Sequence, residues 1–536
     1  MVKYRVTNVL LLALSIAAFL YAPSAALDPY TPPPPACRHL TGLIINPMER
    51  LQGWNTLTGN GAISVFLQTT HGFTGHGIQL AYDLGSNNGA WVQMRLDFPV
   101  PRALTGGDHL RFYYYGSARN TIEIGLVSDT NQNYFGSSWN EAAGTPWWSV
   151  ATWDINDFRT GTGARLYPGQ KVKAVFISVT KSASGVGGTG RFVVDELQLV
   201  NLFSRPVQTS FTSPAPNAAV RAKTATWIAA RQQPGGLLKS WQEEPFPYAY
   251  LYDQALALIV LAQTDLAKAR LLVNRIHLLQ LADGTWYDVY DYGTNASLTS
   301  VRSIGPVAWM SYALTRYALR ETDTALRAIA VQDAWEAAEW LVTQQQPDGS
   351  LLGDVIEPIT EWNLDGWWAL QATGHITQAN ALRDYLLNMV WDPWMGRFKS
   401  STNRYQIFLD NQTWGAAFLR AVGRATDARR ALSYARYVLP VMSSDGSTCG
   451  LDGNGPFSVW HEGTLQYIDQ GGENSTYYMQ QVMKHYAADG GLRNSPDDFS
   501  AYIVWLSRWH GIAPTAWLYF ANADGPFTLT PPPPVT

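Results

Sequence analysis

Apolar and polar residues alternate with a period of two through the first third of the chain. The alternation is clearest at residues 77–84, 91–97, 121–127, 174–179 and 191–199. Segments of this kind, separated by turns rich in Gly, Asn and Ser, predict half-buried β-strands. We therefore expect residues 38–203 to form an all-β sandwich.

A helical period replaces this alternation between residues 219 and 527. One type of segment opens on acidic or aromatic residues and continues as an apolar helix. Its copies recur roughly every 50 to 60 residues, which is typical of repeated helical units; they begin at Tyr252, Gly305, Thr360, Leu409, Trp460 and, more loosely, Ala513. A second type ends in a turn with glycine, at Gly236, Gly284, Gly349, Gly446, Gly490 and, in a degenerate form, Gly396. Alternation of the two types predicts about six helical hairpins.

The connections between these helices differ in length. Each glycine turn is followed by roughly 11 to 24 residues before the next acidic segment, whereas the other connections, as at Thr264-Asp265 and Thr322-Asp323, have only a few. All the long loops should therefore lie at one end of the helical part, together with the starts of the acidic helices. Long loops in compact domains are usually functional. Five acids are expected at that end: Asp253, Glu361, Asp365, Asp410 and Glu462.

The two ends of the chain read as processing and linker segments. Residues 1–26 combine an early positive charge, an apolar stretch too short for a membrane span and the small residues Ser24-Ala25-Ala26, which is typical of a signal peptide. We expect an exported protein, extracellular or periplasmic, with no membrane span after cleavage. Pro-rich or Ser/Thr-rich composition predicts linkers at residues 27–37 and 204–218 and a tail at 528–536.

Composition narrows the class of partner. The chain has 536 residues, a net charge of −4 and only 15% charged residues, so a broad basic surface for nucleic acid is not expected. Its 22 Trp and 27 Tyr suit either stacking on the apolar faces of sugars or a large aromatic core. We expect a monomer. Cys37 and Cys449 could pair after export or remain two separate thiols, and no Cys/His group has the spacing of a zinc site.

The β-strand segments resemble a known family. The succession of LRFYYYGS at 110–117, KVKAVFISVT at 171–180 and GRFVVDELQLV at 190–200 is similar to the galactose-binding-like jelly roll of many carbohydrate-binding modules. The resemblance implies sugar binding and often a structural calcium ion, for which Asp195 and Glu196 are the candidates. Aromatic residues such as Trp147 and Trp148 would then stack on glycan. The alternative is a sandwich that only packs on its neighbour.

The helical part resembles a second family. Six hairpins carrying Tyr252-Asp253-Gln254, Thr360-Glu361-Trp362-Asn363-Leu364-Asp365, Leu409-Asp410 and Trp460-His461-Glu462-Gly463-Thr464 are similar to the (α/α)6 barrel of the six-hairpin glycosidase superfamily. The resemblance covers about residues 219–527. It implies a poly- or oligosaccharide substrate bound at the long-loop end and acidic catalysts, with no catalytic cofactor.

The acids suit that chemistry. Cleavage of a glycosidic bond needs one carboxylic acid to protonate the leaving oxygen and a second carboxylate to activate water or attack the sugar. Glu361 and Asp365 share a helix face, where repulsion can keep one protonated, and Glu462 comes from another helix. Asp253 and Asp410 would support them. Candidates for substrate contacts are Tyr252, Trp286, Arg302, Trp362, Trp414, Trp460 and His461. The alternative for each acid is a helix cap, for each Trp a core position and for His461 a structural role.

Three other functions stay open. A polysaccharide lyase on the same barrel would need a base such as Tyr252 or His461 beside a cation such as Arg302. A non-catalytic glycan-binding protein would keep the aromatics without the chemistry. A terpene-cyclase-like toroid shares the Gln-x-x-Asp-Gly-x-Trp turn at 280–286, but its acidic cluster is missing here and a signal peptide argues against it. The sequence favours a glycoside hydrolase.

Overall fold

The computed structural model describes residues 35–37, 43–72, 75–116, 120–136, 139–140, 145–181, 188–454, 458–498, 504–523 and 525–527. The expected signal peptide, most of the first linker and the tail lie outside these residues. So do the side chains of Trp147 and Trp148. Within the described part, no helix is both long and apolar enough to cross a membrane.

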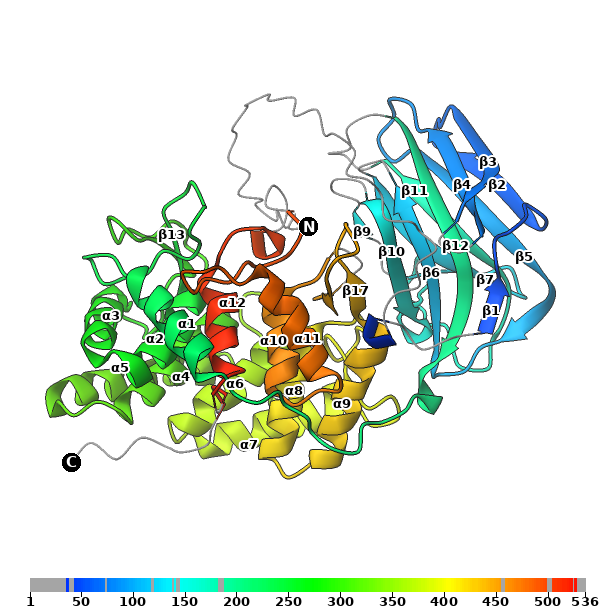
Figure 1. Ribbon diagram of the computed structural model, residues 1–536. Coiled ribbons are helices and arrows are strands. Elements are labelled where there is room, and N and C mark those ends of the chain that lie inside the picture. The colour runs from blue at the N-terminus through cyan, green and yellow to red at the C-terminus, as the bar shows by residue number, and fades with distance from the viewer. Residues whose placement is uncertain are drawn as a thin grey trace.

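Two antiparallel sheets form the N-terminal domain, drawn in blue and cyan in Figure 1. The first has the order β10 (Thr145–Asp154), β6 (Asp108–Gly116), β12 (Thr189–Asn201), β4 (His76–Asp83) and β3 (Ser64–His71), and β1 (Leu43–Asn46) also pairs with β12. The second has the order β2 (Trp54–Gly59), β5 (Trp91–Ala103), β11 (Lys171–Thr180), β7 (Thr121–Ser128) and β8 (Asn133–Phe135), with β9 (Trp139–Asn140) on β7.

The alternation seen in the sequence explains the sandwich core. In β5, Val92, Met94 and Leu96 are buried between the sheets while Gln93 and Arg95 face outward. Residues of one face of a strand meet those of the opposite sheet, so period-two patterns place apolar side chains in one layer. The prediction of a β-sandwich is confirmed.

Twelve α-helices follow in the described part of the chain, and they form two series. The inner helices are α2 (Leu251–Thr264), α4 (Ile304–Ala318), α6 (Thr360–Ala372), α8 (Leu409–Ala421), α10 (His461–Asp469) and α12 (Ile512–Phe520). Each inner helix contacts the next, and α12 contacts α2, so the series closes into a ring. The outer helices are α1 (Ala218–Ala230), α3 (Leu266–Leu279), α5 (Thr324–Thr343), α7 (Ile376–Tyr385), α9 (Ala425–Val438) and α11 (Ser475–Val482). An all-α barrel after the sandwich is the fold class that the sequence predicts.

Burial separates the two series. Nearly every residue of α2 from Leu251 to Ala262 is buried, because an inner helix is covered on all sides. In α3, only one face is buried, through Ala269, Leu272, Val273 and Ile276. Short hairpins lie in the long loops: β13 (Tyr248–Tyr250) with β14 (Val289–Asp291), β15 (Trp391–Asp392) with β16 (Arg397–Phe398), and β17 (Pro440–Met442) with β18 (Cys449–Leu451). Figure 1 labels β13 and β17.

The glycine turns tie neighbouring outer helices together. The amide of Gln280 donates to the carbonyl oxygen of Gly284, which closes the turn, and to that of Asp333 in α5, both at 2.9 Å. Gln232 and Gln345 make the same pair of bonds in their own turns. Gly284 has a φ of 84°, a left-handed conformation that favours glycine. The repeated Gln-to-Gly motif therefore has a structural role.

The sandwich packs on the helical part through its first sheet (Figure 1). A fully buried ion pair joins Asp154, at the end of β10, to Arg397 of β16. Beside it, His109 Nε2 lies 3.0 Å from the hydroxyl of Tyr434 in α9. The contacts are buried and polar on both sides, so the two domains are joined by a specific interface.

A disulfide links Cys37 to Cys449, an outcome that the sequence left open. Cys37 precedes the sandwich, yet it lies against the helical domain, where the hydroxyl of Tyr478 donates to the carbonyl oxygen of Ala36 at 2.7 Å. The segment before the sandwich is thereby fastened to β18.

Candidate active site

Four inner helices bring acidic side chains to one end of the ring. Asp253, Glu361, Asp410 and Glu462 lie in the first turns of α2, α6, α8 and α10, and Asp365 lies one turn further into α6. The N-cap positions of these helices are Tyr250, Ile359, Phe408 and Trp460, and none makes a side-chain capping bond. The acids are thus inside the helices, and capping does not account for Glu361, Asp365 or Glu462.

Glu361 and Asp410 act on each other's ionisation. Burial and the nearby charge of Asp410 raise the pKa of Glu361 well above its usual range, with Asp365 and Glu462 adding to the shift. Burial also raises the pKa of Asp410, but hydrogen bonds from the backbone N–H of Asn411 and from Glu361 hold it to about 6. At neutral pH, Glu361 therefore carries the proton and Asp410 the negative charge.

Asp365 lies next to this pair. It is buried, and burial together with the charge of Asp410 raises its pKa well above the usual range. A Cβ on Gly305 of α4 would lie 3.1 Å from Asp365 Oδ2 and 2.8 Å from the Trp362 ring. Glycine at this position lets α4 approach α6 closely enough to cover the carboxyl group.

Glu462 is held by a chain of hydrogen bonds. The hydroxyl of Tyr252 donates to Glu462 Oε1 at 2.6 Å, and the amide of Gln466 donates to the same oxygen at 3.4 Å. Trp517 Nε1 in turn donates to the Tyr252 hydroxyl at 3.1 Å. Burial, together with the charges of Asp253 and Asp410, raises the pKa of Glu462 to about 8, against the lowering effect of the bonds from Tyr252 and Gln466. A pKa in this range favours the protonated form of Glu462 at neutral pH.

Asp253 has a different environment and a neighbour that the sequence analysis missed. Burial raises its pKa to about 7, although Ser240 and the backbone N–H of Ala513 donate to it. Glu244, in the loop before α2, is only 3% exposed, its Oε2 has no hydrogen-bond partner, and burial with the charge of Asp253 raises its pKa to about 8. Glu244 stands in an irregular loop, where no repeat marks it. Asp253 also binds the start of α12, so it helps to close the ring.

Aromatic rings form a layer around Tyr252. Trp309 of α4 makes edge contacts with Tyr252 at 5.6 Å and with Trp414 at 5.5 Å between ring centroids. Trp309 was not singled out in the sequence, because its segment lacks an acid. Among the four Trp residues predicted to stack in the helical part, all of them described, only Trp362 keeps partial exposure.

Three predicted stacking platforms are wrong. Trp286 is fully buried and donates its Nε1 proton to the carbonyl oxygen of Ile276, so it belongs to the core between α3 and its turn. Trp414 is 3% exposed and Trp460 is 9% exposed, which leaves neither ring a face for a sugar. Trp414 is covered by the rings of Tyr252 and Trp309 from two other inner helices.

The other two predicted ligands have partners within the protein. Arg302 is ion-paired with Asp283 in a glycine turn. His461 is fully buried against His485, at 4.9 Å between ring centroids, and its Nδ1 is bound to the carbonyl oxygen of Arg493. Burial lowers its pKa to about 3. The burial of His461 contradicts its predicted contact with sugar, and Arg302 is engaged by a carboxylate.

The calcium prediction gains no support. Asp195 accepts a hydrogen bond from the backbone N–H of Glu196, and Glu196 accepts one from Gln198. Among the described residues, no group of three or more His, Cys, Asp or Glu side chains could hold a metal ion. A calcium site at Asp195 or Glu196 stays a prediction.

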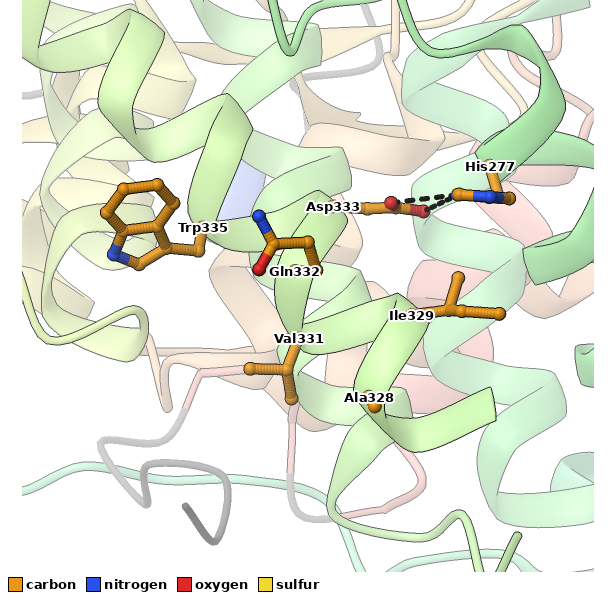
Figure 2. A pocket seen from close by; sticks show the side chains of 7 residues that line it. All are labelled: His277, Ala328, Ile329, Val331, Gln332, Asp333 and Trp335. Atoms are coloured by element: carbon orange, nitrogen blue, oxygen red, sulfur yellow. Dashed lines mark hydrogen bonds and ion pairs between the residues drawn. The ribbon is translucent and has the colours of Figure 1, made fainter. Parts of the chain in front are cut away.

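A surface hollow elsewhere on the helical part is unrelated to the acids. Figure 2 shows it along α5, with His277 of α3 bound to Asp333 at 2.9 Å and 3.1 Å. Its other lining residues are Ala328, Ile329, Val331, Gln332 and Trp335. All of them belong to outer helices, so the hollow does not reach the inner ring.

Comparison with known proteins found no matching family model and no matching curated protein. Among solved structures, the chain is similar to the family 11 carbohydrate-binding module of a cellulosomal cellulase of Clostridium thermocellum, at 16% identity and a TM-score of 0.24 over 30% of this chain and 95% of the module. It is similar to a rhamnosidase from Klebsiella oxytoca with rhamnose bound, at 12% identity and a TM-score of 0.42 over 88% of this chain and 95% of that one. A wild-type glycosidase matches at 13% identity and a TM-score of 0.42 over 57% of this chain and 96% of its own. These values are too low to transfer the chemistry of those proteins to this chain.

Proposed function

We propose that this protein is a glycoside hydrolase of the six-hairpin type, which cleaves a poly- or oligosaccharide at the acidic end of its helical ring. The observation that carries the proposal is the gathering of Glu462 and the Glu361–Asp410 pair at the starts of three inner helices, where burial and their mutual charges raise the pKa values of all three. Glycosidic cleavage needs one carboxyl group that holds a proton and one that is ionised. These two groups supply both at neutral pH.

Glu462 is our general acid. Its Oε1 accepts from Tyr252 and Gln466, so the proton is left to Oε2. Transfer of this proton to the glycosidic oxygen breaks the bond to the leaving sugar, and the two donors then stabilise the carboxylate that forms. General acid catalysis of this kind typically contributes about 10² to 10⁴-fold to the rate.

The Glu361–Asp410 pair is our base. Together the two groups carry one proton and one negative charge, so they can take a proton from water or support a carboxylate that attacks the sugar carbon. Asp365, neutral beside them, would donate a hydrogen bond to a sugar hydroxyl or to the pair. Trp362 is the aromatic residue that we propose for sugar stacking.

The lyase alternative is not favoured by the same geometry. A lyase base must be ionisable near neutral pH, whereas burial and Glu462 raise the pKa of Tyr252 well above its usual range. The predicted cation, Arg302, is engaged by Asp283.

The experiment is an array of defined polysaccharides and oligosaccharides, with products read by mass spectrometry. Hydrolysis adds the mass of one water on cleavage, whereas a lyase releases an unsaturated product without that gain. Cleavage without water, or no cleavage of any glycan by the full chain, would overturn the proposal.

We further propose that the sandwich binds glycan through the outer face of its second sheet, and that the protein is exported. On this face, Gln93 donates to Ser178 at 3.1 Å beside Trp91 and Glu123, while the first sheet packs on the helices. Affinity electrophoresis of the full chain tests the binding: Trp91→Ala should abolish retardation by a bound polysaccharide, and Phe66→Ala on β3 should not. Export is tested by the N-terminal residue of the secreted protein, expected near Leu27.

A further inference from the structure

The chain re-enters the inner ring after its last helix. At Gly525, where φ is +73°, a Cβ would lie 2.8 Å from Asp469 Oδ1 at the end of α10. The buried hydroxyl of Tyr312 in α4 donates to the carbonyl oxygen of Pro526 at 2.8 Å. Two inner helices thus hold this short segment at the end of the ring opposite the long loops.

The next residue, Phe527, packs on three inner helices at once. Its ring stacks on Trp368 of α6, with centroids 4.9 Å apart and an interplanar angle of 28°. It also contacts Trp309 of α4 at 5.5 Å and Trp517 of α12 at 6.1 Å. A side chain from outside the helical repeat therefore becomes part of the ring's aromatic core.

Two of these partners, Trp309 and Trp517, contact Tyr252, whose hydroxyl donates a hydrogen bond to Glu462. Trp517 Nε1 donates to the Tyr252 hydroxyl at 3.1 Å, and Trp309 meets the Tyr252 ring edge-on at 5.6 Å. Tyr252 donates to Glu462 Oε1 at 2.6 Å. Because aromatic side chains in a close-packed core shift when a neighbour is removed, the loss of Phe527 would release both tryptophans behind Tyr252.

We propose that Phe527 is a positioning residue, which fixes Trp309 and Trp517 and, through them, the Tyr252 hydroxyl on Glu462. This inference rests on the role of Glu462 in the proposed function. Small displacements of catalytic groups by mutations outside the chemistry cost up to about 10²-fold in rate.

The first test compares Phe527→Ala with Phe211→Ala in the full chain. Phe211 is also a partly buried aromatic residue of the helical part, but it lies between Arg420 and Arg429, away from the acids. Phe527→Ala should lower kcat about tenfold to hundredfold while KM changes less than about threefold. Phe527→Leu, which keeps most of the volume, should recover part of kcat and serves if the alanine variant does not fold. Equal kcat values for Phe527→Ala, Phe211→Ala and the parent would overturn the inference, as would a parental kcat for Phe527→Leu where the alanine variant does not fold.

The second test reads the protonation of Glu462. The groups that act on it are Tyr252 and Asp253 from α2, Asp410 from α8, and Glu361 from α6. Since the bond from Tyr252 favours the ionised form of Glu462, its loss should move the basic limb of the pH–rate profile to higher pH in Phe527→Ala. A purely structural role would leave this limb in place, which would contradict the inference.

A third readout needs no activity. The change in melting temperature caused by Glu462→Gln grows as pH rises and levels off above the pKa that Glu462 has in the folded protein. The pH at which it levels off should lie higher in the Phe527→Ala background than in the parent, and an unchanged pH would overturn the inference. If the parent cleaves no glycan, the proposed function fails, yet this comparison still decides whether Phe527 acts on Glu462.

Discussion

At the scale of single residues, the acids differ in what surrounds each carboxyl group. Glu462 receives two donors on one oxygen, Asp410 receives the backbone N–H of Asn411, and Glu361 faces Asp410 directly. Burial disfavours the charged form of all three carboxyl groups, and hydrogen-bond donors offset this effect to different degrees. The outcome is one group that gives a proton and one pair that accepts one, within the same cluster.

The roles of Glu462 and the Glu361–Asp410 pair can be separated by the leaving group. Glu462→Gln should slow cleavage of an ordinary glycosidic bond by at least about 10²-fold, because the amide cannot supply a proton. The same variant should lose little on an aryl glycoside whose phenolate leaves without protonation. Asp410→Asn, which removes the ionised carboxylate of the pair, should slow both substrates. Kinetics on the two substrates measure this, and equal losses for Glu462→Gln on both would contradict its role as the acid.

The pH–rate profile should be a bell. The acidic limb of kcat/KM reports loss of the negative charge of the Glu361–Asp410 pair and should lie near 6, the pKa of Asp410. The basic limb reports loss of the Glu462 proton and should lie near 8. The pH–rate profile of the residual activity of Glu462→Gln should still show the acidic limb but no longer the basic one. A rate that still rises above pH 9 in the parent would contradict the assignment.

Folding stability should also depend on the protonation of Glu462. The pKa of Glu462 is raised to about 8 in the folded protein, so the folded state holds a proton that the unfolded chain releases near pH 4 to 5. Folding stability is therefore lost as pH rises from that range through about 8. Glu462→Gln should raise the melting temperature at pH 9 by at least about 2–4 °C, the shift expected for roughly 1 kcal/mol, and the gain should vanish near pH 4.

Calorimetry at several pH values checks this prediction. Asp384→Asn, at an exposed acid on α7, is the matched control and should give no comparable gain. A gain for Glu462→Gln that is the same at pH 4 and pH 9 would contradict the proposed protonation.

The sequence predicted some of the acids of the candidate site but not all of them. Asp253, Glu361, Asp410 and Glu462 could be predicted because each opens a repeated segment. Glu244 could not be predicted, since its loop has no repeat. The Trp residues of the repeated segments, such as Trp414 and Trp460, were predicted to stack on sugar, but they are buried. Whether a tryptophan such as Trp414 faces solvent or the ring depends on how six helices close, which one segment does not encode.

At the scale of elements, loop lengths carried the most information. Short connections at one end and long ones at the other were enough to place every inner-helix start at the same end. The turn with Gln280 and Gly284 was also visible in the sequence, but its function was not: the Gln side chain binds the neighbouring outer helix. The return of residues 525–527 into the ring had no sequence signal, because a Gly-Pro-Phe segment reads as a loop.

At the scale of the whole molecule, the interface between the domains could not be predicted at all. Strand periodicity shows which face of β6 is polar, yet not that His109 meets Tyr434 or that Asp154 meets Arg397. The partners in each contact are more than two hundred residues apart in the sequence. Their polar side chains become buried partners only when the two domains pack together.

This ion pair should be costly to break from one side. Arg397→Met leaves Asp154 buried without its main cation and should destabilise the protein by about 3–5 kcal/mol. Adding Asp154→Leu removes that uncompensated charge, so the double variant should be more stable than Arg397→Met alone. Thermal unfolding of the parent, the two single variants and the double variant measures this, and a double variant with the summed cost of both singles would contradict the coupling.

The most direct measurement of the central claim is cleavage of a glycan by the parent in water enriched in oxygen-18. Hydrolysis by Glu462 and the Glu361–Asp410 pair predicts one labelled oxygen at the new reducing end. Asp410→Asn and Glu462→Gln should each lower this labelling rate by at least about 10²-fold, with the helical circular dichroism unchanged. An unlabelled, unsaturated product, or near-parental labelling by both variants, would contradict the account.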